Sequence, residues 1–319
     1  MTKVLLLADN RTNLITPLLQ GMKDEKIDVT YVDASDLIVL KKYPTTYHRI
    51  KAKIIDGLIL RRKRNWGVEK HIAELCEENF DQIIVMIPAM LSEPAFLSLN
   101  SAFKEKFTCI FLDSINKAPS GKIALKFCSD FFSFDKEDTK YEGVEYLPTY
   151  IEDNVENKNN KTPHNHYFGV FAIDSEEDRR YQKIEALAIC NPEIKGCVYI
   201  FSESSEERRE TINQTQIIHT NRRLVGEQLV QCILDAHCIL DIVDERQTGL
   251  SPRIGNAYSY SRKLITNNTS ANAETWFKDN MLVINESSLT IPLSFIEKEY
   301  VFSENPNSVS NWINKVLAH

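Results

Sequence analysis

The sequence predicts an α/β protein with two domains, each built on a doubly wound parallel sheet. Three observations lead to this fold class. The chain has 319 residues, about twice the usual size of one domain. Its composition, 43% hydrophobic and 26% charged, is that of a globular protein and excludes disordered and collagen-like chains. Apolar runs of strand length alternate with helical patterns in both halves of the chain, as in sheets covered by helices on two faces.

The first half opens with Lys3–Ala8, a near-continuous apolar run typical of a strand buried on both faces. Further short apolar runs predict the later strands, and apolar residues three or four positions apart predict the helices. The expected strands are 27–32, 81–87, 107–112 and 131–134, with 145–147 leading out of the domain. The expected helices are 14–26, 47–64, 68–79, 92–106 and 121–128.

The composition changes over residues 152–166, which are rich in Asn, Lys and Glu and nearly devoid of apolar residues. Such a stretch is typical of an interdomain linker. We therefore expect an N-terminal domain over 1–155, a linker over 156–166 and a C-terminal domain over 167–319. The alternation then resumes, with strands at 167–173, 196–201, 217–219, 238–243, 263–266 and 281–284. Helices are expected at 175–190, 226–236, from 252 onward and at 308–317, the last being a candidate to pack back on the N-terminal domain.

Several classes of protein are disfavoured by absent patterns. The longest apolar runs are far shorter than the roughly 18–20 residues of a membrane span, and no signal peptide is evident, so we expect a cytoplasmic protein. Seven cysteines without a CxxC pair indicate free thiols. The motifs GxGxxG, GxxxxGK[ST] and GxSxG are absent, which argues against dehydrogenases, P-loop NTPases and α/β-hydrolases. His164 and His166 form an HxH pair without carboxylates nearby in sequence, which favours a solvated linker over a metal site.

The charge of the chain is unevenly distributed. Residues 41–64 contain nine basic side chains and one acid, so this segment carries +8 and the rest of the chain −15. The basic residues are Lys41, Lys42, Arg49, Lys51, Lys53, Arg61, Arg62, Lys63 and Arg64. A nucleic-acid-binding protein needs a broad positive field, which this acidic chain lacks. The local patch favours an anionic membrane surface or acceptor, and the alternative is a solvated helix face.

The strongest local candidate for a site is 241–256 (DIVDERQTGLSPRIGN), because ligands of α/β sheets bind beyond the carboxyl ends of strands. With two such domains face to face, we expect the site in the cleft between them. A strand ends near Val243, a polar loop follows, and Ser251–Pro252 opens a helix with a favoured N-cap and first residue. A helix N-terminus suits a phosphate, and Arg253 adds a guanidinium that can grip an anion. The alternative is a capped surface helix with one exposed arginine.

Several motifs resemble one family of enzymes. Residues 247–253 (QTGLSPR) followed by 262–268 (RKLITNN) resemble a block of bacterial surface-polysaccharide glycosyltransferases, the lipopolysaccharide and capsule enzymes of GT-B type, in their CgeB-like branch. Three other segments agree in order: 110–115 (IFLDSI), 132–148 with its FDKED and YLP, and Trp312–Ile313. The resemblance spans the chain from about residue 80.

The resemblance implies the GT-B fold, in which two Rossmann-like domains face each other across a cleft and the C-terminal one binds a nucleotide-sugar donor. It implies no metal and no cofactor, since the nucleotide sugar is a co-substrate. Two departures concern the donor: Asn256 stands where the family usually has an acid near the ribose, and 258–261 (YSYS) replaces a stretch of small residues. The donor diphosphate and nucleotide would be bound by Gln247, Gly249, Leu250, Ser251, Arg253 and Asn256.

We therefore expect a glycosyltransferase that moves a sugar from a nucleotide-sugar donor to a lipopolysaccharide, capsule or exopolysaccharide acceptor. Transfer requires a base for the acceptor hydroxyl, and Asp9 and Asp113, each at the end of a predicted strand, are the candidates. A structural cap is the alternative for both. Residues 41–64 would hold the enzyme against the anionic inner face of the membrane. Two other functions stay open: a non-catalytic GT-B-like subunit that binds nucleotide or glycan for an active partner, and an epimerase of the same fold.

Overall fold

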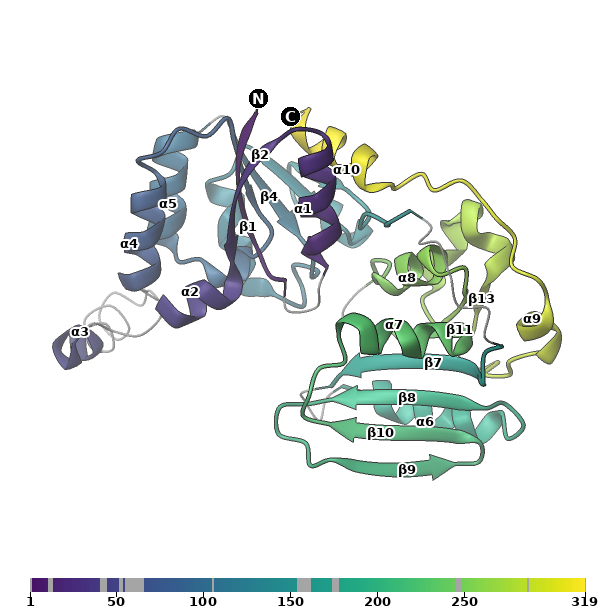
Figure 1. The fold of residues 1–319 in the computed structure, drawn as a ribbon. Coiled ribbons are helices and arrows are strands. Elements are labelled where there is room, and N and C mark those ends of the chain that lie inside the picture. Colours follow the sequence, from purple (N-terminus) through teal and green to yellow (C-terminus); the bar gives the residue numbers. More distant parts are fainter. Residues whose placement is uncertain are drawn as a thin grey trace. The chain divides into compact units, whose positions relative to one another are not determined.

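The computed structural model describes residues 2–10, 14–40, 45–51, 54, 66–104, 106–153, 162–173, 178–244, 248–285 and 287–318 (Figure 1). The chain divides into two compact units. Unit 1 consists of Met1–Pro148 together with Val309–His319, and unit 2 consists of Thr149–Ser308. The last helix of the chain therefore belongs to the same unit as the N-terminus.

Unit 1 contains a parallel sheet with the strand order β2-β1-β3-β4-β5-β6. Its strands are β1 (Lys3–Ala8), β2 (Asp28–Asp33), β3 (Gln82–Val85), β4 (Phe107–Phe111), β5 (Asp130–Ser133) and β6 (Val144–Tyr146). The central strands β3 and β4 are buried along their whole length, as expected of strands covered by helices on both faces.

Helices cover both faces of this sheet (Figure 1). The helices of unit 1 are α1 (Ile15–Asp24), α2 (Ala34–Leu40), α3 (Thr46–Lys51), α4 (Trp66–Leu75), α5 (Glu93–Phe103) and α10 (Val309–Leu317), with 3₁₀ helices at Pro88–Met90, Pro119–Lys126 and Lys136–Lys140. Leu5 and Leu7 of β1 share a buried cluster with residues of α2, α4 and α5. The C-terminal helix α10 packs closely on α1 at Gly21, where an added Cβ would lie 2.5 Å from a methyl carbon of Val309. The absence of a side chain at Gly21 thus permits this contact.

Unit 2 contains a second sheet with the order β13-β12-β11-β7-β8-β10-β9. Its strands are β7 (Asn165–Ala172), β8 (Gly196–Phe201), β9 (Arg208–Ile212), β10 (Thr215–Thr220), β11 (Ala236–Asp241), β12 (Lys263–Thr266) and β13 (Met281–Val283). All pairs are parallel except β9 with β10, which form an antiparallel hairpin at one edge. Its helices are α6 (Arg180–Cys190), α7 (Gly226–Leu234), α8 (Arg253–Ser259) and α9 (Leu293–Glu297), with 3₁₀ helices at Thr269–Ala273 and Thr275–Asn280.

Each sheet reverses its strand order once, and the reversal defines the expected ligand position. In unit 1 the chain runs from β1 to its neighbour β2 and then crosses to β3 on the other side of β1. In unit 2 it runs from β7 to β8 and later returns to β11 on the other side of β7. Open α/β sheets bind ligands beyond the carboxyl ends of the strands at such a switch point. The residues that follow Ala8, Ala172 and Asp241 occupy these positions.

The predicted α/β class with doubly wound parallel sheets is confirmed. The strands Lys3–Ala8, Gly196–Phe201 and Lys263–Thr266 have their predicted bounds. The edge strand β9 was not predicted, and the helix expected at 121–128 is a 3₁₀ helix at Pro119–Lys126.

Part of the predicted linker and basic helix lies outside the described residues. Of the expected linker, 156–161 is not described, and its last two residues belong to β7. Of the expected helix 47–64, α3 covers the start, and Ile50 and Ile54 are 51% and 49% exposed. No described helix is long and apolar enough to cross a membrane. The seven cysteines are all free; Cys109 and Cys238 are buried, whereas Cys190 is exposed.

Candidate functional site

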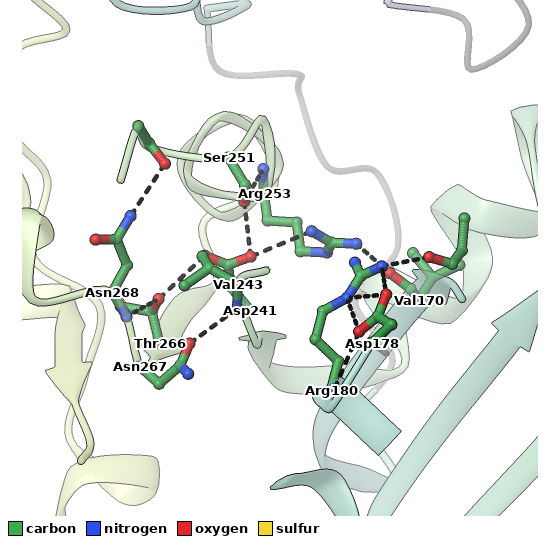
Figure 2. Close-up of polar contacts among 12 residues, drawn as sticks. Val170, Asp178, Arg180, Asp241, Val243, Ser251, Arg253, Thr266, Asn267 and Asn268 are labelled. Carbon is green, nitrogen blue, oxygen red and sulfur yellow. Dashed lines mark hydrogen bonds and ion pairs between the residues drawn. The ribbon is translucent and has the colours of Figure 1, made fainter. Parts of the chain in front are cut away.

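Polar side chains from several segments of unit 2 converge beyond the carboxyl ends of β7 and β11 (Figure 2). They come from the start of α6, the last residue of β11, the loop before α8, the start of α8 and the end of β12. The residues are Asp178, Arg180, Asp241, Ser251, Arg253, Thr266 and Asn268. Their position is the switch point of this sheet, so they form the candidate site.

Asp241 is the centre of this cluster and is 2% exposed. Its Oδ1 accepts hydrogen bonds from the hydroxyl of Ser251 at 2.7 Å and from Nη1 of Arg253 at 3.2 Å. Its Oδ2 accepts one from the hydroxyl of Thr266 on the adjacent strand β12 at 3.0 Å. A buried carboxylate is costly unless it is paired and hydrogen-bonded. These donors meet that need and tie the loop, α8 and β12 to the end of β11.

Arg253 begins α8, and its side chain is 20% exposed. Besides the bond to Asp241, its Nη2 donates to the carbonyl oxygen of Val170 on β7, and its guanidinium lies 4.8 Å from the ring centre of Phe171. Its Nε is buried and has no hydrogen-bond partner among the described residues. Burial lowers the pKa of Arg253, and the charge of Asp241 opposes this effect. The counter-charge of Arg253 in the first turn of α8 is thus Asp241 of the same unit.

A second arginine–carboxylate pair lies next to the first. Nε of Arg180, at the start of α6, donates to both oxygens of Asp178 at 2.9 and 3.0 Å, and Nη2 donates to the carbonyl oxygen of Ala172 at the end of β7. The two side chains are 14% and 5% exposed. Burial alone raises the pKa of Asp178, but the bonds from Arg180 outweigh it and the net pKa lies below its usual value. The positive charge of Arg180 also lowers the pKa of Arg253, so the two pairs share one electrostatic environment.

The loop before α8 is held from the end of β12 by Asn268, which is 4% exposed. Nδ2 of Asn268 donates to the carbonyl oxygens of Gly249 at 3.0 Å and of Thr248 at 3.2 Å. Its Oδ1 accepts the backbone N–H of Ser270 at 3.0 Å, which fixes the orientation of the amide. The loop therefore has a defined backbone geometry on the β12 side.

The helix start differs from the sequence expectation. α8 begins at Arg253, one residue after the predicted start at Pro252, and has seven residues. The hydroxyl of Ser251 accepts from the backbone N–H of Arg253 at 3.3 Å, as a cap would, and donates its own proton to Asp241. So short a helix has a weak dipole, which lessens the argument for a phosphate at its N-terminus.

The other predicted donor residues are distributed around this loop. Gly249 is buried, and Leu250 is partly buried and packs against a cluster that includes Ile254 and Tyr258. Asn256 is half-buried on α8. Gln247 lies outside the described residues.

In unit 1, Asp9 follows β1 at the switch point, beside a hydrogen-bonded group of residues. The backbone N–H of Asn10 donates to Oδ2 of Asp33 at 3.1 Å, and Asp33 also accepts from the hydroxyl of Tyr31 and from Ser35. Burial raises the pKa of Asp33, but these hydrogen bonds outweigh it and bring the pKa to about 2. The pKa of Tyr31 is raised by burial, by Asp33 and by the charge of Asp9. Asp9 therefore lies in an anionic environment.

Asp113 also lies beyond the carboxyl ends of the strands of that sheet. It follows β4, which is two strands from β1 because β3 lies between them. Its Oδ1 accepts from Nζ of Lys117 at 2.8 Å, and its side chain is 52% exposed. Asp135 and Asp138 are the buried carboxylates of this region; Asp138 accepts from the hydroxyl of Ser133 at 2.6 Å and from the backbone N–H of Ile115. Asp138 is the last residue of the FDKED segment that resembles the family, and the sequence assigned it no role.

The histidine pair of the expected linker has partners that the sequence did not indicate. Nδ1 of His164 lies 2.5 Å from Oδ1 of Asp235, and Nδ1 of His166 accepts the backbone N–H of Lys195 at 2.9 Å. Both histidines precede or begin β7, at the end of the sheet opposite to the candidate site. Both rings thus have hydrogen-bond partners within unit 2, while the side chain of His164 is 70% exposed.

Sequence reasoning identified the segment of the site but not the residues that organise it. Asp241, Asn268 and Arg180 were assigned no role. The signal for Asp241 was present, since it is the charged residue in an otherwise apolar run (CILDIV). Asn268 follows the strand KLIT in the second resembling block, and nothing in its spacing indicated contact with Gly249.

No protein-family model matches this chain, and no curated protein matches it. Solved structures do resemble it over its whole length. An α,α-trehalose-phosphate synthase (UDP-forming) from Burkholderia vietnamiensis has a TM-score of 0.54 at 10% identity and covers 100% of this chain and 99% of its own. HepE of Anabaena, solved with UDP and glucose, has a TM-score of 0.51 at 10% identity, covering 100% and 89%. The BGT of phage T4, solved with its UDP-glucose substrate, has a TM-score of 0.50 at 11% identity, covering 99% and 96%.

At 10–11% identity these similarities show a shared fold. The resemblance read from the sequence implied two Rossmann-like domains, and the two parallel sheets with these neighbours confirm that fold.

Proposed function

We propose that this protein is a glycosyltransferase that uses a nucleotide-sugar donor. The observation that carries the proposal is the whole-chain similarity to a UDP-forming synthase, to a protein solved with UDP and glucose, and to one solved with its UDP-glucose substrate. Two Rossmann-like sheets in one chain would give each substrate a separate domain, and the sequence motifs at 247–268 resemble the donor region of GT-B enzymes. A UDP-sugar is accordingly the first donor to test.

We place the donor on unit 2, at the loop before α8. Support comes from the position of this loop at the switch point and from the bonds that hold it to Asp241 and Asn268. Reaction at a nucleotide sugar requires donors for the departing diphosphate. Among the described residues, peptide N–H groups of the loop and the guanidinium of Arg253 are candidate donors there. No metal or cofactor is included in the proposal.

We place the acceptor and its base on unit 1. Asp9, at the switch point of that sheet, would accept the proton of the acceptor hydroxyl as it attacks the donor sugar. Asp113 is the second candidate. The resemblance to surface-polysaccharide enzymes supports a lipopolysaccharide, capsule or exopolysaccharide acceptor, met in the cytoplasm at the inner face of the membrane. The basic segment 41–64 supports that location.

A second candidate function is a non-catalytic nucleotide- or glycan-binding subunit of the same fold. It is favoured by Asn256, which stands where the resembling family usually has an acid. Such a protein would bind the nucleotide but release no free sugar or transfer product.

A thermal-shift panel of UDP-, GDP-, CMP- and dTDP-sugars tests the donor. A ligand at 100 times its Kd stabilises the folded state by about 2.7 kcal/mol, so one member of the panel should raise the Tm clearly. That nucleotide sugar is then incubated with the protein and cell-envelope glycans, and nucleotide release is measured. Release that depends on the glycan supports the transferase, whereas binding without release supports the subunit. If no member of the panel changes the Tm, the donor proposal is wrong.

A further inference from the structure

The loop before α8 presents two consecutive peptide groups in one direction. Nδ2 of Asn268 draws the carbonyl oxygens of Thr248 and Gly249 toward itself, at 3.2 and 3.0 Å. In a planar trans peptide the N–H points opposite to the C=O of the same unit. The N–H of Gly249 belongs to the unit whose carbonyl is that of Thr248, and the N–H of Leu250 belongs to the next. Both N–H groups therefore point away from Asn268.

No described residue accepts a hydrogen bond from either N–H. Gly249 is buried, and an unsatisfied buried peptide donor costs about 1–3 kcal/mol. Successive backbone N–H groups that face the same side form an anion-binding arrangement, as in phosphate-binding loops. This pair of donors is the second feature, after the switch-point position, that indicates an anion here.

The charges of the cluster favour these peptide donors over the nearby arginines. Arg253 is already paired with Asp241, and Arg180 with Asp178, so each guanidinium is neutralised within the fold. An anion must compete with a buried carboxylate for either arginine. The N–H groups of Gly249 and Leu250 have no such competitor among the described residues.

We propose that Asn268 is a positioning residue that turns the N–H groups of Gly249 and Leu250 toward a diphosphate. The amide cannot exchange its two ends, because Oδ1 is occupied by the N–H of Ser270 and only Nδ2 faces the loop. Asn268→Ala removes the donor that holds both peptides. Asn268→Asp places a carboxylate against two carbonyl oxygens, which repels them. This inference deepens the proposed donor site, and the identity of the diphosphate rests on the proposed function.

A matched control exists in the same unit. Asn280 is 1% exposed, and its amide holds the backbone of Val301 through two bonds, at 2.7 and 2.9 Å. Asn280→Ala therefore removes a buried asparagine that braces a different loop. The stability loss should be similar to that of Asn268→Ala, whereas only the change at Asn268 should affect anion binding.

The two amides can be observed individually by NMR. The sequence contains one Thr–Gly pair, 248–249, so ¹³C-carbonyl threonine with ¹⁵N-glycine labels the amide of Gly249 alone. It contains two Gly–Leu pairs, 57–58 and 249–250, so glycine and leucine labelling gives two signals. The probes are inorganic pyrophosphate and UDP, titrated into the full-length protein.

Both probes should shift the Gly249 signal and one of the two leucine signals in the unmodified protein and in Asn280→Ala. In Asn268→Ala the affinity for pyrophosphate should fall about tenfold or more, the scale of a lost charged hydrogen bond, and the shifts should vanish. Pyrophosphate shifts without tighter binding of UDP would support the positioning role and contradict the nucleotide donor. Binding of UDP that leaves both amides unshifted, or that survives Asn268→Ala, would overturn the positioning role alone. Binding of neither probe would overturn both.

Discussion

Nη1 of Arg253 lies 3.2 Å from Oδ1 of Asp241, and the two side chains are 20% and 3% exposed. The bond joins the start of α8 to the end of β11, so the helix that carries the candidate site is tied to the sheet by a largely buried ion pair. When one partner of such a pair is removed, the other charge is left buried and uncompensated. The arginine is thus a structural residue whatever it binds.

Arg253→Ala should lower the free energy of unfolding by about 3–5 kcal/mol, the usual cost of breaking a buried pair from one side. The measurement is urea denaturation followed by circular dichroism. The double variant Asp241→Asn/Arg253→Met should recover much of the loss, because no buried charge remains. A double variant no more stable than Arg253→Ala contradicts this account of the pair. The sequence alone predicts that Arg253→Ala would leave the fold intact.

Arg253→Lys separates donor binding from stability. Lysine keeps the positive charge near Asp241 but lacks the planar fork that binds phosphate in two places. If Arg253 contacts the donor, nucleotide affinity should fall by about 1.5–3 kcal/mol, with a smaller loss of stability than in Arg253→Ala. Calorimetry with UDP measures it. Arg262→Lys is the control, since among the described residues the guanidinium of Arg262 bonds to carbonyl oxygens of Ile233, Leu234 and Ser261. Equal UDP affinity in Arg253→Lys would remove Arg253 from the donor site.

The sequence predicted the strands correctly where burial on both faces of a sheet requires an apolar run. Lys3–Ala8 and Gly196–Phe201 are interior strands, and their near-continuous apolar runs have one stable location, inside a parallel sheet. β9 (RRETI) was missed because an edge strand that pairs on one side carries no apolar run. Its existence depends on pairing with β10, which a local pattern does not show.

The site was predictable as a segment but not as a set of bonds. Ser251, Arg253 and the loop glycine have local signals in capping, charge and turn chemistry. The partner of Arg253 lies twelve positions away at the end of a strand, and Asn268 reaches the loop from another strand. Such contacts depend on strand order, which the alternation of elements leaves open. From the sequence, a bound anion was therefore the expected counter-charge of Arg253, whereas in the structure Asp241 is its counter-charge.

Asp33 should make the stability of the protein depend on acid pH. Its pKa is about 2 in the folded protein against an ordinary value of 3.8. A carboxyl group whose pKa is lower in the folded than in the unfolded protein stabilises the folded state at pH values above the unfolded pKa. This contribution is lost as the pH falls toward 2. Because the side chain is partly exposed, solvent screening makes its contribution smaller than the roughly 2 kcal/mol of the full pKa difference, and about half of the contribution should be lost by pH 3. Urea midpoints of the unmodified protein and Asp33→Asn should therefore differ most near pH 6 and converge toward pH 2. A difference between them that does not change with pH would show that Asp33 is not the titrating group.

The basic segment should bind anionic membranes. Residues 41–64 carry +8, although most of them lie outside the described residues. Within the described part, Tyr47, Ile50 and Ile54 are 68%, 51% and 49% exposed, at spacings that repeat on one face of a helix. Exposed apolar side chains among basic ones suit a lipid surface, to which each basic residue adds about 1 kcal/mol at most.

Vesicle sedimentation tests this contact. Binding to vesicles with anionic lipid should weaken as salt rises, because exposed charges are screened over about 8 Å at physiological ionic strength. The variant with Arg61, Arg62, Lys63 and Arg64 changed to Ser should lose binding. The charge-matched control changes Lys122, Lys126, Lys136 and Lys140, which are exposed on the same unit, and should retain it. Equal loss in both variants would indicate a net-charge effect without a membrane site in 41–64.

The final prediction concerns the base that accepts the acceptor proton. Asp113 is held by Lys117 at 2.8 Å and is more than half exposed, whereas Asp9 lies at the switch point next to the carboxylate-rich group around Asp33. Asp9→Asn should therefore slow sugar transfer by about 10²–10⁴-fold, the usual contribution of a general base. Nucleotide affinity should not change, because the donor is assigned to unit 2. Asp113→Asn should leave most of the activity. Transfer is measured as acceptor-dependent UDP release across pH 5–9, where loss of the acid limb in Asp9→Asn would identify the titrating base. A severe loss in Asp113→Asn with normal transfer in Asp9→Asn would reverse the assignment.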